Sequence, residues 1–239
     1  MTHAPQNLVI LTGAGISAES GISTFRDAGG LWEGHHIEDV ASPRGFARNP
    51  ELVHHFYNLR RAQLPQVAPN AAHLALDALE RAWLLARRGQ FLLITQNVDD
   101  LHERAGSQHL VHMHGELRKL RCTACETVLD WSGPAHPHTP CPACARPGGT
   151  LRPDIVWFGE VPYNMDLCLR ALLSADIFCA IGTSGLVYPA AGFVETAREN
   201  GRACRLYEIN PTPTGLFDEV IAEPASGGVA RFLRRLGIA

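Results

Sequence analysis

Residues 13–27 read GAGISAESGISTFRD, and they directly follow an apolar run at residues 8–11 that ends in Thr12. An apolar run that passes into a Gly-x-Gly turn is typical of a buried strand followed by a phosphate-binding loop. Gly13 and Gly15 permit turn dihedrals and the close approach of a ligand, and Ala18 is small enough for a following helix to pack on the strand. The N-terminus of that helix would offer N–H groups to a pyrophosphate. These residues predict a dinucleotide site, although glycine turns without a ligand are also common.

The rest of the sequence continues this succession of short apolar runs and amphipathic segments. Strands are predicted at residues 91–95, 109–115, 155–158, 177–181 and 206–209, and helices at 51–63, 70–87, 166–173, 188–200 and 229–236. Repeated strand, turn and helix indicate an α/β fold with a Rossmann-like, doubly wound parallel sheet covered on both faces. Polar residues 96–99 and small residues 182–185 each follow a predicted strand, at the edge where such sheets bind ligands.

Four of the seven cysteines form two CxxC pairs, arranged as Cys122-x2-Cys125-x15-Cys141-x2-Cys144. Two such pairs can place four thiolates around one tetrahedral Zn²⁺. When all four ligands are cysteine sulfurs, no coordination position is open for catalysis. The segment around them is rich in Pro and Gly and too poor in apolar residues to form its own core. We therefore expect one structural Zn²⁺. The alternatives are a redox pair, unliganded thiols, or a site in which His136 or His138 replaces a cysteine.

Composition excludes several classes of function. The net charge of the 239-residue chain is -3, so no general basic field exists to bind nucleic acid. The apolar run at residues 8–11 lacks a basic leader and predicts a strand rather than a signal peptide, and no stretch is long enough to span a bilayer. Paired cysteines in an unsecreted chain favour a reducing compartment. We expect a cytoplasmic protein, monomeric, with neither a nucleic-acid nor a membrane partner.

A few polar residues are candidates for chemistry. His114 precedes Gly115 and the cysteine segment, where two lobes would meet, and a neutral imidazole there can act as a general base near pH 7. Tyr57 and Arg60 are three residues apart on a predicted helix and share a face, so they can bind a carboxylate together if that face lines a pocket. Arg26, beside the glycine turn, has a phosphate as its natural partner. The alternative for each is an ordinary surface or core residue.

The distance to the second strand argues against an ordinary dehydrogenase. A Rossmann unit places an acidic residue on the ribose about twenty residues after its glycine turn. Here that distance falls at residues 32–39, inside an irregular region, and the next strand begins only at Phe91. The setting is unusual for hydride transfer.

Seven segments, taken together, resemble the sirtuin family of NAD-dependent protein deacylases. They are GAGISAESGISTFRD, TQNVDDLHERAG, HMHG, the four cysteines, IVWFGE, GTSGLVYPA and EIN, in the family's order from about residue 8 to residue 226. The short termini and the Tyr57-x-x-Arg60 pair resemble the bacterial CobB-type branch, class III. The resemblance implies a Rossmann-like NAD-binding domain from residues 1–33, 70–117 and 152–239, and a small domain from a helical insertion, 34–69, and a zinc-ribbon insertion, 118–151.

The resemblance implies that NAD is a co-substrate that is consumed. The glycine turn and Arg26 would hold the pyrophosphate, and Phe25 would lie over the nicotinamide ribose. The implied NAD-binding residues are Gly13, Ala14, Gly15, Ala18, Glu19, Phe25, Arg26, Trp32, Gln96, Asn97, Val98, Asp99, Gly182, Thr183, Ser184, Asn210 and Ala225. The catalytic residues would be His114 and Asn97. The acyl-lysine oxygen would attack ribose C1′ as nicotinamide leaves, giving an alkylimidate. His114 would then take a proton from the ribose hydroxyls, so that the 2′ oxygen attacks the imidate carbon and water releases free lysine and O-acyl-ADP-ribose.

The resemblance also implies how an acyl-lysine protein binds. The substrate peptide would lie as an added strand between two backbone segments, formed by Phe158, Gly159, Glu160, Val187 and Tyr188. Tyr57 and Arg60 would face the acyl end, where a forked Arg favours succinyl or malonyl groups, and the small Ala41 would leave room for them.

Two other functions remain possible from the sequence. One is NAD-dependent protein ADP-ribosyl transfer, which cleaves the same nicotinamide bond and differs in its acceptor. The other is a zinc-ribbon binding module that carries a nucleotide only as a ligand.

Overall fold

A six-stranded parallel sheet forms the centre of the molecule. The computed structural model describes residues 6–23, 31–32 and 34–238. The strands are β1 (Leu8–Thr12), β4 (Phe91–Thr95), β5 (Leu110–His112), β9 (Ile177–Ile181), β10 (Arg205–Ile209) and β11 (Glu219–Ile221). Their order is β11-β10-β9-β1-β4-β5, and every neighbouring pair is parallel. The predicted doubly wound α/β fold is confirmed.

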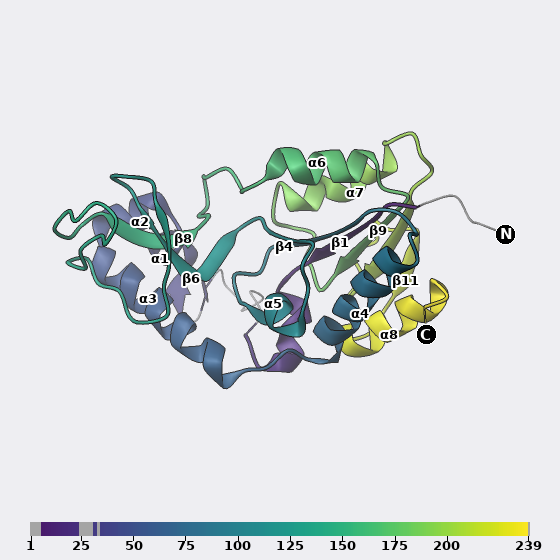
Figure 1. Ribbon diagram of the computed structural model, residues 1–239, viewed down its shortest axis with the longest axis horizontal. Coiled ribbons are helices and arrows are strands. Elements are labelled where there is room, and N and C mark those ends of the chain that lie inside the picture. The colour runs from purple at the N-terminus through teal and green to yellow at the C-terminus, as the bar shows by residue number, and fades with distance from the viewer. Residues whose placement is uncertain (1–5, 24–30, 33, 239) are drawn as a thin grey trace.

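Helices cover both faces of this sheet (Figure 1). α4 (Ala71–Leu85) and α8 (Ala225–Arg235) lie on one face, and α6 (Met165–Leu173) and α7 (Phe193–Arg198) lie on the other. Side chains alternate along each strand, so Ile10 packs in the core of the first face and Leu11 in the core of the second. This two-sided burial explains why the strands read as unbroken apolar runs.

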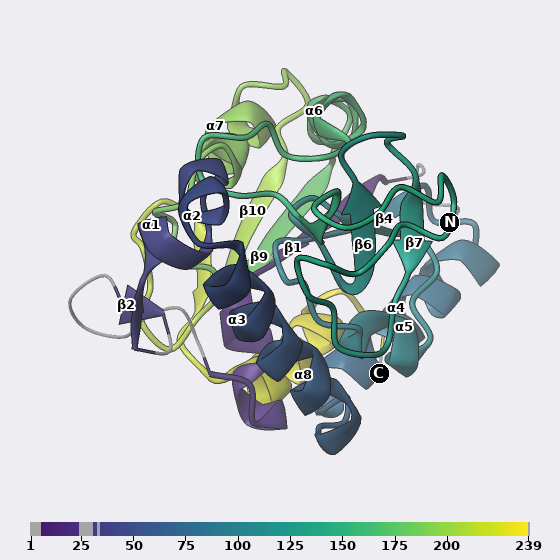
Figure 2. The ribbon, with the colours of Figure 1, turned by 90° about the vertical axis from the view of Figure 1, so that its left-hand side faces the viewer.

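A second, antiparallel sheet lies at one end of the large one. β6 (Gly115–Cys122) pairs with β7 (Val128–Asp130) and β8 (Leu151–Ile155). The helices α1 (Ile37–Val40), α2 (Pro43–Arg48) and α3 (Pro50–Gln63) occupy the same end, together with the short strands β2 (Leu31–Trp32) and β3 (His35–His36). Figure 2 looks at this end, with α3 in front of the large sheet.

Side chains of α3 tie the helical region to the cysteine-bearing region. Asn58 bonds both the N–H and the carbonyl oxygen of Ala135, at 2.9 and 2.8 Å. Arg61, which is buried, donates from Nε to the carbonyl oxygen of Leu117 at 2.6 Å. None of the helices within the described ranges has the length and apolar composition needed to cross a membrane.

Some predicted elements differ in the structure. Residues 155–158 do not continue the parallel sheet, because Ile155 ends the antiparallel strand β8 and Trp157 packs against the helical region. β6 has no counterpart among the predicted strands, since a register shift between Gly115 and Leu120 breaks its alternation. The predicted helix at 188–200 is shorter and consists of a 3-10 turn (Ala190–Gly192) followed by α7.

Candidate active site

A pocket of about 450 Å³ lies at the carboxyl ends of the central strands. The chain leaves β1 for β4 on one side and later returns to β9 on the other side of β1. This reversal is the switch point, where open parallel sheets bind ligands. Residues that follow β1, β4, β9 and β10 all line the pocket.

The turn after β1 is in close contact with the turn after β9. The N–H of Gly15 donates to the carbonyl oxygen of Gly182 at 2.9 Å, and a Cβ atom on Gly13 would lie 2.8 Å from that same oxygen. Gly13 has an extended backbone, with φ of -125°, that any residue adopts. Gly13 and Gly15 are therefore required by the contact between the two turns, not by unusual backbone dihedrals. The α-helix expected after Gly15 is instead two 3-10 turns, Ala14–Ile16 and Ala18–Ser20, and Gly21, with φ of 90°, ends the second.

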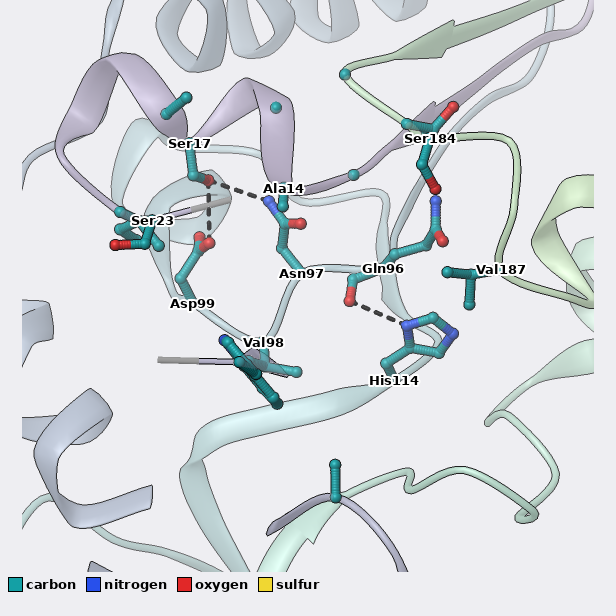
Figure 3. A pocket seen from close by; sticks show the side chains of 18 of the residues that line it. Ala14, Ser17, Ser23, Gln96, Asn97, Val98, Asp99, His114, Ser184 and Val187 are labelled. Atoms are coloured by element: carbon teal, nitrogen blue, oxygen red, sulfur yellow. Dashed lines mark hydrogen bonds between the residues drawn. The ribbon is translucent and has the colours of Figure 1, made fainter. Parts of the chain in front are cut away.

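The loop after β4 is held by a chain of hydrogen bonds (Figure 3). Asn97 Nδ2 donates to Ser17 Oγ, and Ser17 Oγ donates to Asp99 Oδ2, both at 3.0 Å. Burial raises the pKa of Asp99, and hydrogen bonds from the Leu101 N–H and from Ser17 oppose that rise. Ser17 was not among the predicted site residues, because a lone serine in a glycine turn gives no signal of such a distant partner.

His114 lies in the turn between β5 and β6, and its ring faces the pocket beside Val187 (Figure 3). Its Nδ1 atom is 3.1 Å from the carbonyl oxygen of Gln96. Burial lowers the pKa of His114, so the ring is neutral near pH 7. Because a carbonyl oxygen only accepts, Nδ1 carries the hydrogen and Nε2 keeps its lone pair. The ring is thus oriented and protonated as a general base requires.

Two loops form the outer wall of the pocket. Phe158 and Tyr188 are 50% and 79% exposed, which are high values for aromatic side chains. The Phe158 N–H donates to the carbonyl oxygen of Ala41 at 3.0 Å. Glu160 accepts two hydrogen bonds from Arg152, at 2.6 and 2.9 Å. Burial alone would raise the pKa of Glu160, but these bonds lower it. The charged carboxylate also accepts a hydrogen bond from the Trp157 N–H at 2.8 Å and so holds its loop in place.

Tyr57 and Ala41 line the pocket from the helical region. Tyr57 is fully buried, and its hydroxyl oxygen accepts a hydrogen bond from Trp157 Nε1 at 3.0 Å. Arg60 is not among the described residues that line the pocket. Its guanidinium carbon lies 3.4 Å from the centre of the Phe56 ring, and its Nη1 donates to the Phe56 carbonyl oxygen at 2.7 Å. The shared helix face therefore brings Tyr57, but not Arg60, to the pocket wall.

The four paired cysteines converge on one point. Their sulfur atoms lie within 4.8 Å of one another, and two of the S···S distances are 3.9 Å. Four sulfurs bound tetrahedrally at about 2.3 Å from one Zn²⁺ would lie roughly 3.8 Å apart. The donor set and its spacing fit a structural Zn²⁺.

Comparison with known proteins identifies the family. The model of the Sir2 family matches residues 13–189 of the chain. The chain belongs to the Sir2 family.

Individual Sir2 relatives match over almost the whole chain. A protein of Bdellovibrio bacteriovorus named NAD-dependent protein deacylase is 56% identical over 233 residues, which are 95% of each chain. A Sir2 homolog in complex with NAD has a TM-score of 0.85 and 38% identity, with 97% of this chain and 90% of that chain covered. A mutant Sir2 homologue in complex with 2′-O-acetyl ADP-ribose has a TM-score of 0.84 and 38% identity, with 97% and 93% covered.

Most of the site residues predicted from the resemblance to this family line the one pocket. These are Gly13, Ala14, Gly15, Ala18, Glu19, Trp32, Ala41, Tyr57, Gln96, Asn97, Val98, Asp99, His114, Phe158, Gly159, Glu160, Gly182, Thr183, Ser184, Val187, Tyr188, Asn210 and Ala225. Phe25 and Arg26 lie outside the described residues. The lining residues that the sequence did not single out include Ser17, Ile22, Ser23, Val156, Trp157 and Pro162. They have apolar or small side chains without a recognisable chemical signature.

Proposed function

We propose that this Sir2 protein is a CobB-type, NAD-dependent protein-lysine deacylase. The observation that carries the proposal is the neutral ring of His114, whose Nε2 lone pair is available beside a pocket at the switch point of the sheet. The relative from Bdellovibrio bacteriovorus carries this activity in its name, and the acetyl-ADP-ribose in a related structure is a molecule that such an enzyme would produce.

The two strand-end turns suit the phosphates and the adenosine half of NAD. Their close packing leaves backbone without Cβ atoms at the pocket wall, and Asn210 Nδ2 braces the second turn by donating to the Thr183 carbonyl oxygen at 2.7 Å. When NAD is bound, it supplies an electrophilic ribose carbon as nicotinamide departs. Asn97 and Asp99 are buried and line the pocket, and we assign them to the nicotinamide ribose and carboxamide.

His114 would accept a proton at Nε2 from a ribose hydroxyl, and the Gln96 carbonyl oxygen would stabilise the resulting imidazolium through Nδ1. The substrate peptide would add as a strand between the exposed edges around Phe158 and Tyr188. Main-chain hydrogen bonding of this kind accepts many sequences, because it reads no side chain.

We extend the proposal to succinyl- and malonyl-lysine substrates, whose acyl groups end in a carboxylate. Ala41 and Tyr57 would surround the end of the acyl chain, and Arg60 lies one helical turn beyond Tyr57. To bind a carboxylate there, the Arg60 guanidinium would turn from the Phe56 ring toward the pocket. A forked Arg–carboxylate contact provides the driving force.

The proposal includes one structural Zn²⁺ and a small domain made of residues 34–69 and 118–151. It also includes a monomeric protein in the reducing cytoplasm, where free thiolates persist, without a nucleic-acid partner.

The deciding experiment is a side-by-side assay of acetyl-, succinyl- and malonyl-lysine peptides with NAD, read by mass spectrometry. Deacylation removes the acyl mass and releases one nicotinamide per lysine freed. A peptide that gains the mass of ADP-ribose would instead establish the transferase. If acyl peptide releases no nicotinamide, the protein only binds its nucleotide.

A further inference from the structure

His112 contacts two hydrogen-bond acceptors at once. Its Nδ1 lies 3.1 Å from the carbonyl oxygen of Asn97, and its Nε2 lies 2.6 Å from Glu103 Oε1. The side chain of His112 is 9% exposed and that of Glu103 is 39% exposed. A carbonyl oxygen can only accept a hydrogen bond, and so can a carboxylate oxygen. Both ring nitrogens must therefore carry hydrogen, so the ring is an imidazolium.

The neighbouring His114 differs in charge. His114 and His112 contact the carbonyl oxygens of two consecutive residues, Gln96 and Asn97, through the same ring atom, Nδ1. Only His112 has an acceptor at Nε2 among the described residues. One ring is thus a neutral base and the other a fixed cation, and both hold carbonyl oxygens of the loop after β4.

The charges around His112 agree with this assignment. Burial lowers its pKa, but the hydrogen bond and charge of Glu103, with the charge of Glu116, raise it overall. His112 in turn opposes the rise that burial gives the pKa of Asp99. The titratable and charged groups that face His112 are Glu103 and His102 on α5 (Leu101–Ala105), Glu116 with its partner Lys119 on β6, and Asp99 in the loop after β4.

We infer that His112 is a positioning residue for the proposed deacylation: as an imidazolium anchored by Glu103, it holds the Asn97 carbonyl oxygen and so fixes the bonds from Asn97 through Ser17 to Asp99. This inference rests on the proposed function. The anchored cation lets the loop keep its geometry while His114 gains and loses its proton. Above the pKa of His112, the Nε2 lone pair would face the Glu103 carboxylate, and the repulsion would release the loop.

Glu103→Gln tests the charge without removing the contact. The glutamine amide can donate to Nε2, so a neutral His112 ring keeps both hydrogen bonds. We therefore expect the alkaline fall in kcat/KM for NAD that the wild type shows to disappear in this variant, because the neutral ring still holds the Asn97 carbonyl oxygen and faces no carboxylate. KM for the acyl peptide should change little, because the peptide lies on the outer wall. His112→Gln should lower kcat/KM for NAD about tenfold while the variant remains folded, because it removes one charged hydrogen bond.

Glu219→Gln is the matched control, since Glu219 is 42% exposed and pairs with Arg235 at 3.1 Å on the far edge of the sheet. Its pH profile should match that of the wild type. Nitrogen-15 NMR of the histidine rings gives an activity-independent readout, in which both His112 nitrogens should be protonated at pH 7.5 in the wild type. A neutral His112 ring, or an unchanged alkaline fall in Glu103→Gln, would overturn the inference. A wild type that deacylates nothing would overturn the proposed function, and the NMR signal would still decide the charge of His112.

Discussion

The N–H of Gly15 donates to the carbonyl oxygen of Gly182, and a Cβ atom on Gly15 would lie 2.6 Å from the Cα atom of Gly182. Gly182 has a φ of 61°, and a Cβ atom placed there would lie 2.6 Å from the Gly15 backbone. The two turns that would hold the phosphates and adenosine of NAD are thus locked together, and each requires the other to lack a side chain.

Gly15→Ala should therefore separate these turns. Because the nearest atoms belong to backbone, the clash has no flexible side chain to relieve it, and we expect a loss of about 1–3 kcal/mol in the free energy of unfolding. Urea unfolding and NAD titration measure the two consequences, reduced stability and weaker NAD binding. Gly133→Ala is the control, since among the described residues, apart from its two chain neighbours, no atom lies within 4 Å of its added Cβ. Wild-type stability and NAD affinity in Gly15→Ala would contradict the proposed contact.

The large sheet could be predicted from sequence because its strands are recognisable one at a time. Residues 8–12, 91–95 and 177–181 are apolar runs buried on both faces, and each ends in small or polar residues. Parallel strands bring those ends to one edge, so the positions of Gln96, His114 and Gly182 near the pocket followed without knowledge of any contact.

The remaining features depend on contacts between distant residues, which a single sequence does not reveal. Ser17 acquires its role from Asp99, 82 residues away. β6 is hidden by its register shift, and Ile155 belongs to the antiparallel sheet only because β6 is there to pair with it. The Arg60 guanidinium lies against the Phe56 ring and near the Trp32 ring, a direction that helix periodicity leaves open.

His114→Tyr should abolish deacylation while the protein stays folded and keeps zinc. In the wild type the acid limb of kcat/KM should lie below pH 6.5, because burial lowers the pKa of His114 and the base acts only when neutral. Activity should therefore rise as pH increases through that pKa and be lost as pH falls. His55→Tyr, at an exposed position on α3, is the control for the added ring. Full activity in His114→Tyr would remove His114 from the role of base.

Cys144→Ser should release zinc and destabilise the small sheet. The core around the cysteines contains only five buried residues in the described chain, Leu120, Cys122, Ala135, Cys141 and Leu151, which is too few to hold the segment without a metal. Zinc content by atomic absorption and the Tm of the variant measure the effect. Cys204→Ser changes a cysteine in the core of the large sheet and should keep zinc. One zinc per chain in Cys144→Ser would show that this thiolate is not a ligand.

Arg60→Met should lower desuccinylation far more than deacetylation. An Arg–carboxylate contact contributes about 1.5–3 kcal/mol, which corresponds to roughly ten- to hundredfold in kcat/KM for the succinyl peptide. An acetyl group has no carboxylate, so kcat/KM for the acetyl peptide should change by less than about twofold. Any such change would come from lost packing of Arg60 on Phe56. Arg81→Met on α4, where the side chain is 72% exposed, controls for the loss of one positive charge. Equal losses on both peptides would mean that Arg60 supports α3 and does not read the acyl group. Arg60→Lys refines the test, because a lysine keeps the charge without the fork and should recover only part of the succinyl preference.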